Sequence, residues 1–213
     1  MKSLTVLNER RDAPRLQALS EQDATRPVVL IGFQKQGNLG IGYLAATLMR
    51  RGHRVKVLDF EDAAEQILAT IEAEVPVVVG FSLIFQFYLP RFRALMQYLR
   101  NHGVRCHFTI GGHFPSLSHE RTLELIPEVD SVVRFEGEVT LLELVESLIH
   151  DQDWRRIDGL AYRRDGRFVS NPLRHLLDDL DVLPFPYRQY EPTAILGQRT
   201  MPILASRGCS RTC

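Results

Sequence analysis

PVVLIGFQKQGNLGIGYLAATLMRRGHRVKVLDF, residues 27–60, is the first copy of a pattern that repeats along the chain. It opens with a continuous run, 27–32, that is rich in β-branched residues, which is typical of a strand buried on both faces. Apolar side chains then recur at helical spacing between Ile41 and Met49, and a glycine supplies a helix stop. A second apolar run, 54–60, follows. The stretch therefore predicts a strand, a helix and a second strand.

The same alternation continues to about residue 149. The predicted strands are 27–32, 54–60, 76–82, 104–110 and 130–135, and the predicted helices cover about 41–49, 62–74, 92–99, 118–125 and 138–149. Strands that alternate with helices of this length form right-handed crossovers and a parallel sheet covered on both faces. The fold class predicted is α/β, a flavodoxin-like (Rossmann-like) doubly wound five-stranded parallel sheet.

Composition narrows the function classes. The 213 residues carry 26 basic and 26 acidic side chains, and a net charge of zero argues against a nucleic-acid partner. With 45% hydrophobic and 24% charged residues, the chain has the composition of an ordinary globular protein. No apolar run reaches the ~18 residues of a membrane span. The first residues lack the apolar core of a secretory signal, so a cytoplasmic location is expected.

The chain changes character after Asp151. A hairpin is predicted around Asp165-Gly166, and the prolines and acidic residues that follow indicate a connector. Met201–Ser206 has the apolar character of one more strand and runs into a cysteine-containing loop. The predicted organisation is an N-terminal arm (1–26), the α/β domain (27–150), a hairpin and linker (151–200), and the first strand and cysteine loop of a truncated second domain (201–213).

The candidate binding residues lie where strands end. In doubly wound sheets, ligands bind beyond the carboxyl ends of the strands, where the strand order reverses between the first and third strands. A glycine pair allows close backbone approach, a serine hydroxyl can bind a ligand or only its own backbone, and a helix N-terminus can hold polar atoms or simply be capped. The candidates are Gln34, Lys35, Gln36, Gly37, Asn38, Leu39, Ser82, Leu83, Gln86, Gly111, Gly112, His113, Phe114, Glu136, Gly137 and Glu138.

Other titratable residues favour structural interpretations. His113 follows the glycine pair, so a ligand contact is expected there rather than catalysis. Helical spacing places Arg91, Arg93 and Arg100 on a solvated outer face rather than in a basic patch. The residues interpreted as structural are His53, His102, Cys106 and His107.

The last nine residues, ASRGCSRTC, contain two of the three cysteines, Cys209 and Cys213. Thiolates are the usual ligands of iron–sulfur clusters, although two closely spaced cysteines can also be incidental. The stretch resembles the opening of the radical S-adenosylmethionine (SAM) signature, C-x-x-x-C-x-x-C. The resemblance implies that Cys209 and Cys213 are metal ligands, the first two of the three that hold a [4Fe–4S] cluster whose fourth iron binds SAM. The third would fall three positions beyond the last residue.

Three stretches of the α/β part resemble the N-terminal cobalamin-binding domains of B12-dependent radical SAM enzymes. They are 38–59, which matches a first helix and second strand, 111–116, with its glycine pair, and 132–144, where the fifth strand turns into its helix. Together with the cysteine loop, the resemblance covers residues 27–213. It implies that this domain binds cobalamin and that the carboxyl edge of the sheet faces a catalytic barrel.

The resemblance also implies a chemistry. The cluster reduces SAM to a radical that abstracts hydrogen from an unactivated carbon, and methylcobalamin often then delivers a methyl group, although some relatives catalyse cyclisation or rearrangement. The loop Phe33–Gly40 contains no histidine, so no histidine ligand is expected on the lower face of cobalt. The partners implied are a small-molecule or peptide substrate bound by the barrel and an electron donor such as flavodoxin or ferredoxin.

Two alternatives stay open at this point. The chain could be a non-catalytic α/β binding or sensor module, or part of a radical SAM enzyme whose Rossmann-like domain no longer binds cobalamin. In the interpretation adopted, the fragment binds corrinoid and does not turn over substrate alone, because the pocket for the substrate lies in the rest of the barrel.

Overall fold

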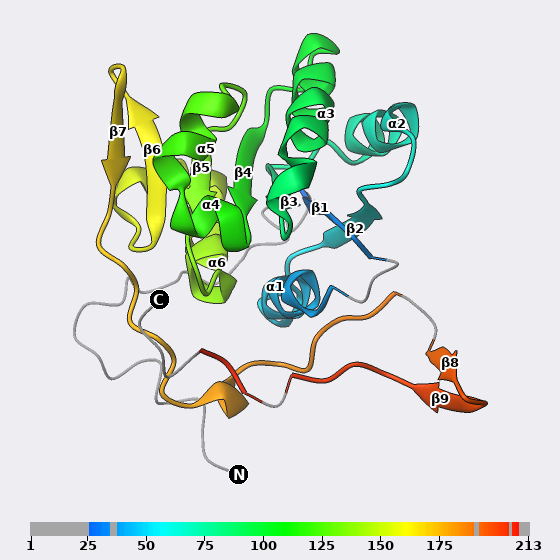
Figure 1. Ribbon diagram of the computed structural model, residues 1–213. Coiled ribbons are helices and arrows are strands. Elements are labelled where there is room, and N and C mark those ends of the chain that lie inside the picture. Colours follow the sequence, from blue (N-terminus) through cyan, green and yellow to red (C-terminus); the bar gives the residue numbers. More distant parts are fainter. Residues whose placement is uncertain (1–25, 35–37, 190–191, 205, 209–213) are drawn as a thin grey trace.

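The fold is an α/β sandwich around one sheet, described by a computed structural model over residues 26–34, 38–189, 192–204 and 206–208 (Figure 1). The sheet has seven strands in the order β2-β1-β3-β4-β5-β6-β7. Their bounds are β1 (Val28–Gly32), β2 (Val55–Asp59), β3 (Val78–Ser82), β4 (His107–Gly111), β5 (Ser131–Val133), β6 (Leu160–Arg164) and β7 (Arg167–Ser170).

The five N-terminal strands are parallel, as predicted. Every residue of β1 is buried, and β1 pairs with β2 on one side and β3 on the other. A central strand with neighbours on both sides and helices on both faces has no polar surroundings, which explains its uninterrupted apolar sequence. The doubly wound class is confirmed.

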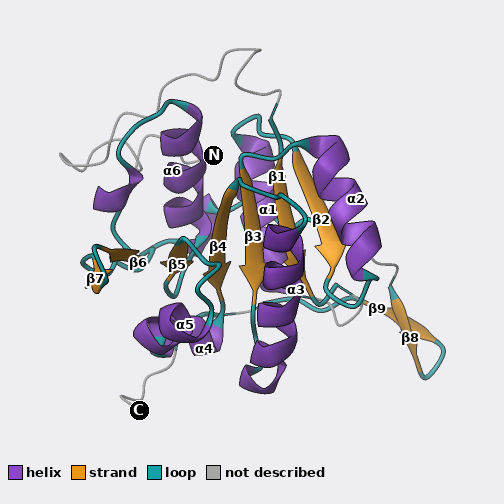
Figure 2. Ribbon diagram, turned by 90° about the horizontal axis from the view of Figure 1, so that it is seen from above, coloured by secondary structure: helices purple, strands orange, loops and turns teal. Residues whose placement is uncertain are grey.

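Helices cover both faces of the sheet (Figure 2). One face carries α1 and α6, and the other carries α2, α3 and α5. The helix bounds are α1 (Leu39–Arg50), α2 (Ala64–Glu74), α3 (Leu89–Asn101), α4 (His113–Leu117), α5 (His119–Leu125) and α6 (Glu138–Ile149), with short 3-10 turns η3 (Gln86–Tyr88), η4 (Trp154–Arg156) and η5 (Leu180–Val182).

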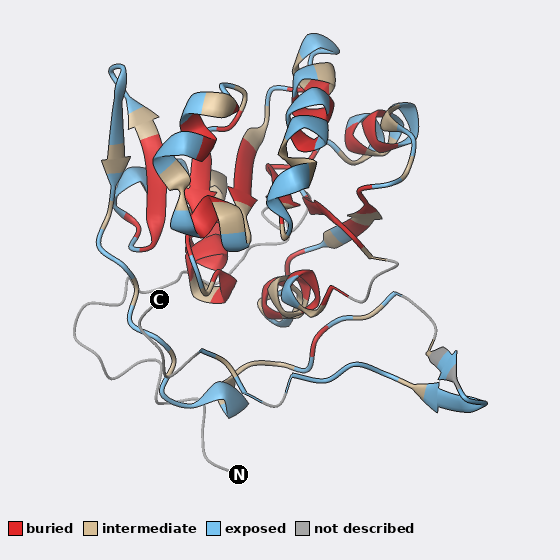
Figure 3. Cartoon of the chain, viewed as in Figure 1, coloured by how far each residue is buried: buried red, intermediate tan, exposed pale blue. Residues whose placement is uncertain are grey.

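Each face has its own apolar core, visible as buried segments on both sides of the sheet (Figure 3). Beneath α2 and α3 the core is aromatic, with the rings of Phe60 and Phe92 stacked 3.9 Å apart. Beneath α1 and α6 it is aliphatic, built from residues such as Ile41 and Leu144. Full burial of a side chain of this kind contributes roughly 1.5–3 kcal/mol, so the two layers together hold the helices on the sheet.

The predicted hairpin exists, but it belongs to the sheet. β6 pairs antiparallel with β5, and β7 pairs with β6. Asp165 and Gly166 form the turn with φ of 50° and 74°, the left-handed conformations that a two-residue hairpin turn requires. The hairpin was expected in the linker because the turn pattern does not show which edge of the sheet the hairpin joins.

The strand expected at Met201–Ser206 is not observed, so this prediction is wrong for the described residues. Residues 201–204 form no strand and are exposed, and residue 205 lies outside the described part of the chain. Instead, a small hairpin of β8 (Thr193–Ile195) and β9 (Gln198–Thr200) precedes them. A strand needs a partner for its backbone groups, and none of the described strands pairs with 201–204. Within the described residues, no helix is both long and apolar enough to cross a bilayer.

Candidate functional site

The candidate site is the carboxyl edge of the parallel strands. β1, β3, β4 and β5 end at this edge, where the arrowheads of Figure 2 lie together. The chain moves outward from β1 to β2 on one side and from β3 to β5 on the other, so the predicted reversal between β1 and β3 is confirmed. The loops after these strands lie next to one another at the reversal.

Asn38 and Ser82 meet at this reversal. Asn38 is the N-cap of α1, since its Oδ1 accepts the N–H of Ile41 at 3.2 Å, and its Nδ2 donates to Ser82 Oγ at 3.4 Å. A Cβ on Gly32 would lie 3.2 Å from both Asn38 Nδ2 and Ser82 Cβ, so the glycine allows the contact. The structure brings these two predicted residues together, and each already has a partner within the protein.

Gln34 carries a buried polar atom without a partner. Its Nε2 is buried and finds no hydrogen bond among the residues that the structure describes. Its backbone N–H donates to Asp59 Oδ2 at 2.9 Å, and Asp59 Oδ1 accepts the N–H of Glu61 at 2.8 Å. A buried donor without an acceptor is costly, so a ligand atom at this place would satisfy it. The predicted residues Lys35, Gln36 and Gly37 lie outside the described residues.

The glycine pair Gly111-Gly112 packs against the chain itself. Gly112 has φ of +110°, and a Cβ there would lie 2.2 Å from the carbonyl oxygen of Leu83. Leu83 N–H donates to Gly111 O at 2.9 Å, and the Leu83 side chain is fully buried in the core. The glycines therefore let the β3 loop approach the β4 loop, and the Leu83 side chain does not face the edge.

Phe135 follows β5 in a left-handed conformation, with φ of 59°. Its N–H donates to Ser116 Oγ at 2.8 Å, and Ser116 Oγ donates to Gly112 O at 2.7 Å. The Phe135 side chain is 53% exposed. For a residue other than glycine, this backbone conformation costs roughly 1–2 kcal/mol. Phe135 is not among the predicted residues, because neither its φ angle nor the exposure of its ring follows from the sequence motif.

Large apolar side chains are exposed on the segments that follow β3, β4 and β5. We call this set the apolar rim: Phe85 (44% exposed), Phe87 (71%), Leu117 (75%) and Phe135 (53%). The rings of Phe85 and Phe87 lie 5.7 Å apart. Scattered apolar exposure is ordinary, but its presence on three consecutive loops of one edge is typical of a binding surface. The predicted residues Gln86 and His113 are exposed on the same segments.

The acidic residues at the start of α6 have partners within the chain. Glu138 is buried and forms an ion pair with Arg207 at 2.6 Å, and Glu136 Oε2 accepts the N–H of Leu177 at 3.5 Å. Gly137 packs between Val133 and Leu44. Of the remaining predicted residues, Leu39 begins α1 and Phe114 packs partly against the core.

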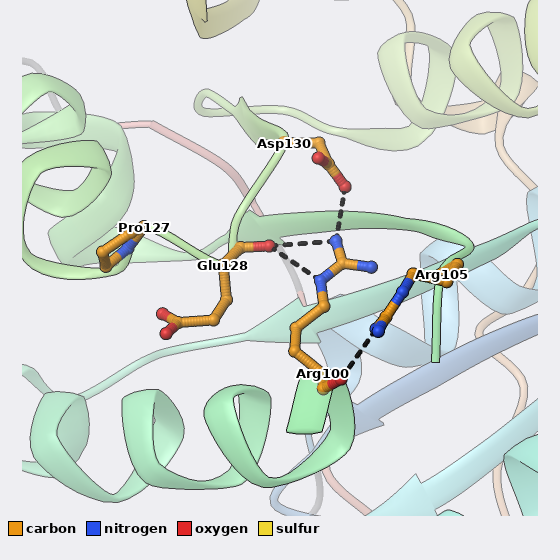
Figure 4. A pocket seen from close by; sticks show the side chains of 5 residues that line it. All are labelled: Arg100, Arg105, Pro127, Glu128 and Asp130. Atoms are coloured by element: carbon orange, nitrogen blue, oxygen red, sulfur yellow. Dashed lines mark hydrogen bonds and ion pairs between the residues drawn. The ribbon is translucent and has the colours of Figure 1, made fainter. Parts of the chain in front are cut away.

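A cavity of about 410 Å³ lies at the opposite, amino-terminal edge (Figure 4). Arg100 stands in it and donates to the carbonyl oxygens of Glu128, Val104 and Cys106 and to the carboxylate of Asp130. The solvated position expected for Arg100 is therefore wrong, since its side chain is 18% exposed. Helical spacing could not show this, because all four acceptors lie outside the helix, and Glu128 and Asp130 are 28 and 30 residues away. A second cavity of about 250 Å³ lies between α3 and α5.

Cys106 and His107, at the start of β4, are held in their neutral forms. Burial raises the pKa of the Cys106 thiol to about 11 and lowers the pKa of His107 to about 4. His107 Nε2 lies 2.8 Å from Ser131 Oγ. A protonated thiol is a poor nucleophile and a poor metal ligand. The His107 ring already has a partner in Ser131, in agreement with a structural role.

The predicted metal ligands Cys209 and Cys213 lie outside the described residues. Among the residues that the structure does describe, no three histidine, cysteine or acidic side chains are grouped so that they could hold a metal ion.

Comparison with known proteins identifies relatives. The B12 binding domain family matches residues 28–145. An uncharacterized methyltransferase of Pyrococcus horikoshii is 29% identical over 82% of this chain and 39% of its own length. An anaerobic magnesium-protoporphyrin IX monomethyl ester cyclase of Synechocystis is 28% identical over 82% of this chain and 36% of its own length. The chain thus spans less than half of these curated relatives.

The fold also matches a solved structure. The radical SAM methyltransferase TsrM from Kitasatospora setae, solved with cobalamin and a [4Fe-4S] cluster bound, superposes with a TM-score of 0.61. The two sequences are 21% identical, and the match covers 78% of this chain and 33% of that protein. At this identity the likeness concerns the fold.

Proposed function

The chain belongs to the B12 binding domain family, and on that premise we propose that the carboxyl edge of its sheet binds cobalamin as part of a B12-dependent radical SAM enzyme. The observation that carries the proposal is the unmet bonding at this edge. A buried amide of Gln34 lacks a partner among the described residues, and the apolar rim leaves aromatic side chains in water.

The residues present fit the chemistry of a corrinoid. Its macrocycle has broad apolar faces, and its periphery carries amide groups, so it suits aromatic contacts combined with a few hydrogen bonds. The apolar rim would contact the macrocycle, the Gln34 amide would bind a peripheral acceptor, and the Asn38–Ser82 pair would orient the loops that do so. The backbone around Gly111 and Gly112 completes the seat.

Cobalamin supplies a cobalt centre that can carry a methyl group. The contribution of this chain is to hold and shield that centre. The loop Phe33–Gly40 has no histidine, so the proposed state has no histidine ligand to cobalt from this loop. The exposed rings of Phe85, Phe87 and Phe135 would exclude water from the edge once they are covered.

For the longer protein, the proposal includes a [4Fe-4S] cluster and SAM, with Cys209 and Cys213 as the first two cluster ligands. Relatives named as a methyltransferase and as a cyclase support two reaction classes. They are methyl transfer to an unactivated carbon and radical cyclisation or rearrangement. A small-molecule or peptide substrate and a flavodoxin or ferredoxin as electron donor belong to the same proposal. The net charge of zero argues against a nucleic-acid partner.

A second candidate is an α/β scaffold that no longer binds cobalamin, or a non-catalytic binding module. The position of the two cavities favours it, since one lies at the amino-terminal edge and the other between α3 and α5. Cobalamin binding and scaffolding make opposite predictions for the visible spectrum.

The test is to mix the purified chain with hydroxocobalamin, remove free ligand by desalting and record the visible spectrum. The expected result is a stoichiometric corrinoid absorption that stays with the protein. Circular dichroism establishes that the sample is folded. A folded but colourless protein would overturn the proposal in favour of the scaffold.

A further inference from the structure

The connector after β7 does not leave the domain but runs back along α1 and α6 (Figure 1). Arg174 forms an ion pair with Glu143 of α6, and Arg50 of α1 donates to Val182 O at 2.6 Å. Further along, the N–H of Tyr187 donates to Gly42 O at 2.9 Å. The connector is thus attached to both helices at successive points.

The contact at Gly42 depends on the absence of a side chain. A Cβ on Gly42 would lie 2.6 Å from Tyr187 O and 3.0 Å from Pro186 Cβ. Gly42 itself lies inside α1, where glycine is unfavourable by about 0.5–1 kcal/mol relative to alanine. A helix interior that carries glycine where the connector touches it indicates that α1 is shaped to receive the connector.

Arg207 makes the final contact. Its Nη2 lies 2.6 Å from Glu138 Oε1, and the two side chains are only 14% and 6% exposed. Its guanidinium also lies over the ring of Tyr43, 4.6 Å from the centroid. Glu138 begins α6 and Tyr43 belongs to α1, so one side chain joins both helices.

We infer that Arg207 is a positioning residue that fixes where the cysteine loop leaves the corrinoid edge, and this inference rests on the proposed function. Arg207 precedes Cys209 by two positions, and two residues of chain span at most about 7 Å. Anchoring Arg207 to the first turn of α6 therefore limits the distance between a corrinoid on the edge and a cluster on the loop.

Arginine is suited to this task in a way that lysine is not. Its planar guanidinium binds a carboxylate and stacks on an aromatic ring at the same time, whereas a lysine ammonium is a compact charge. The Arg207 contacts use both properties, with Glu138 on one side and the Tyr43 ring beneath. A plain charge pair that only stabilises the fold would not need the ring.

The experiment measures the distance directly. Cys106 and Cys213 are changed to serine, a fluorophore whose emission overlaps corrinoid absorption is attached to Cys209, and hydroxocobalamin is bound as the quencher. In the parent the inference predicts strong quenching with a narrow lifetime distribution. In Arg207→Ala it predicts at least a twofold gain in emission and a broadened distribution, with the affinity for hydroxocobalamin changed less than threefold. Arg207→Lys should fall between the two.

Arg188→Ala is the matched control. Arg188 lies in the same connector, but the hydrogen bonds recorded for it reach only the connector carbonyls of Pro186 and Pro202. Its replacement should leave the quenching at the parental value. Equal quenching in the parent and in Arg207→Ala, with cobalamin bound in both, would overturn the inference.

A second readout separates this inference from the proposed function. Limited proteolysis without cobalamin, by a protease that does not cut at arginine, should cleave residues 201–204 slowly in the parent and faster in Arg207→Ala, because the anchor restrains the segment. If the anchor behaves in this way but hydroxocobalamin is not retained, the proposed function fails and positioning toward a corrinoid fails with it. If hydroxocobalamin binds but the cleavage rate is unchanged by Arg207→Ala, only the positioning role is overturned.

Discussion

The two edges of the sheet differ in which polar groups lack hydrogen-bond partners and which apolar side chains are exposed. At the amino-terminal edge a cavity of about 410 Å³ surrounds Arg100, and this guanidinium already donates to three carbonyls and a carboxylate. Glu128 Oε2, which belongs to a residue that lines this cavity, is buried without a hydrogen bond among the described residues. At the carboxyl edge neither of the two cavities appears, but the Gln34 amide has no partner among the described residues and Phe135 is exposed on a strained backbone.

The difference lies in the combination of groups: only the carboxyl edge, among the described residues, pairs an unbonded buried donor with exposed aromatic rings on the neighbouring loops. A guanidinium whose donors are satisfied gains little from a ligand, whereas a buried donor without an acceptor gains a full hydrogen bond. An edge also suits a large flat ligand better than a closed pocket does, because a second surface can close over it. Mutations at the two edges should therefore separate stability from cobalamin affinity.

The largest effect is expected from Gly112→Ala at the carboxyl edge. The new Cβ would lie 2.2 Å from Leu83 O in a backbone with φ of +110°, so the β3 and β4 loops must separate. We expect a loss of roughly 3 kcal/mol or more in the free energy of unfolding, measured by urea denaturation. Gly103→Ala is the control, since φ is +88° there but no atom lies within 4 Å, and it should cost about 1–2 kcal/mol. Equal losses would show that the loop contact is not tight.

At the amino-terminal edge, Arg100→Ala should reduce the free energy of unfolding by roughly 2–3 kcal/mol, because the carbonyls of Val104, Cys106 and Glu128 lose their donor. The dissociation constant for hydroxocobalamin, measured by absorbance titration on the folded variant, should not change. Arg93→Ala, an exposed position on the same helix, should stay within about 0.5 kcal/mol of the parent. A large loss of cobalamin affinity in Arg100→Ala would contradict the assignment of the two edges.

His107 should make stability depend on pH. Burial lowers its folded pKa to about 4, from 6.5 in the unfolded chain, with Asp130 opposing and Arg100 and Arg155 assisting. Between these values the unfolded state binds more protons, so the stabilising contribution is complete above pH 6.5 and is lost as the pH falls toward 4. From pH 7 to 5 we expect a loss of roughly 1–2 kcal/mol in urea denaturation that His107→Gln reduces. The same pH slope in both proteins would exclude His107 as the cause.

The smallest effect is expected from two glycine substitutions that distinguish backbone strain from cobalamin binding. Phe135→Gly and Val75→Gly each remove a left-handed, exposed apolar residue, with φ of 59° and 48°, but only Phe135 lies at the carboxyl edge. The free energy of unfolding of both variants should lie within about 1 kcal/mol of the parent value, since relief of backbone strain offsets the greater flexibility of glycine in the unfolded chain. Hydroxocobalamin should bind about tenfold more weakly to Phe135→Gly, or ~1.4 kcal/mol, and unchanged to Val75→Gly. Equal affinities would remove Phe135 from the site.

The parallel sheet could be predicted because its signal is local. The apolar run of β1 follows from burial on both faces of the strand, and the helical spacing of α1 and α6 follows from packing against the sheet; both are confirmed. What could not be predicted depends on distant partners. The pairing of β6 with β5, the contact of Arg100 with Glu128 O and the contact of Arg207 with Glu138 each join segments about 30 or more residues apart.

For the candidate site, the location could be predicted from the sequence, but the orientation of individual side chains could not. The reversal between β1 and β3 follows from strand order, and the meeting of Asn38 with Ser82 follows from that reversal. The sequence did not reveal that Leu83 points into the core or that Phe135 is displayed at the edge, because these depend on backbone angles and on the neighbouring glycine. The strand expected at 201–206 failed because apolar composition does not provide a pairing partner.

The hairpin of β6 and β7 has a practical consequence for cutting this chain into pieces. β5 is only three residues long, and in the intact sheet its outer backbone groups pair with Leu160, Ala161 and Tyr162. A fragment that stops at residue 150 would expose that short edge and uncover the buried Leu160 contact surface, which invites association between copies. A fragment that continues through residue 189 would keep both the edge and the seat of Tyr187 on α1, and it should remain monomeric where the shorter one aggregates.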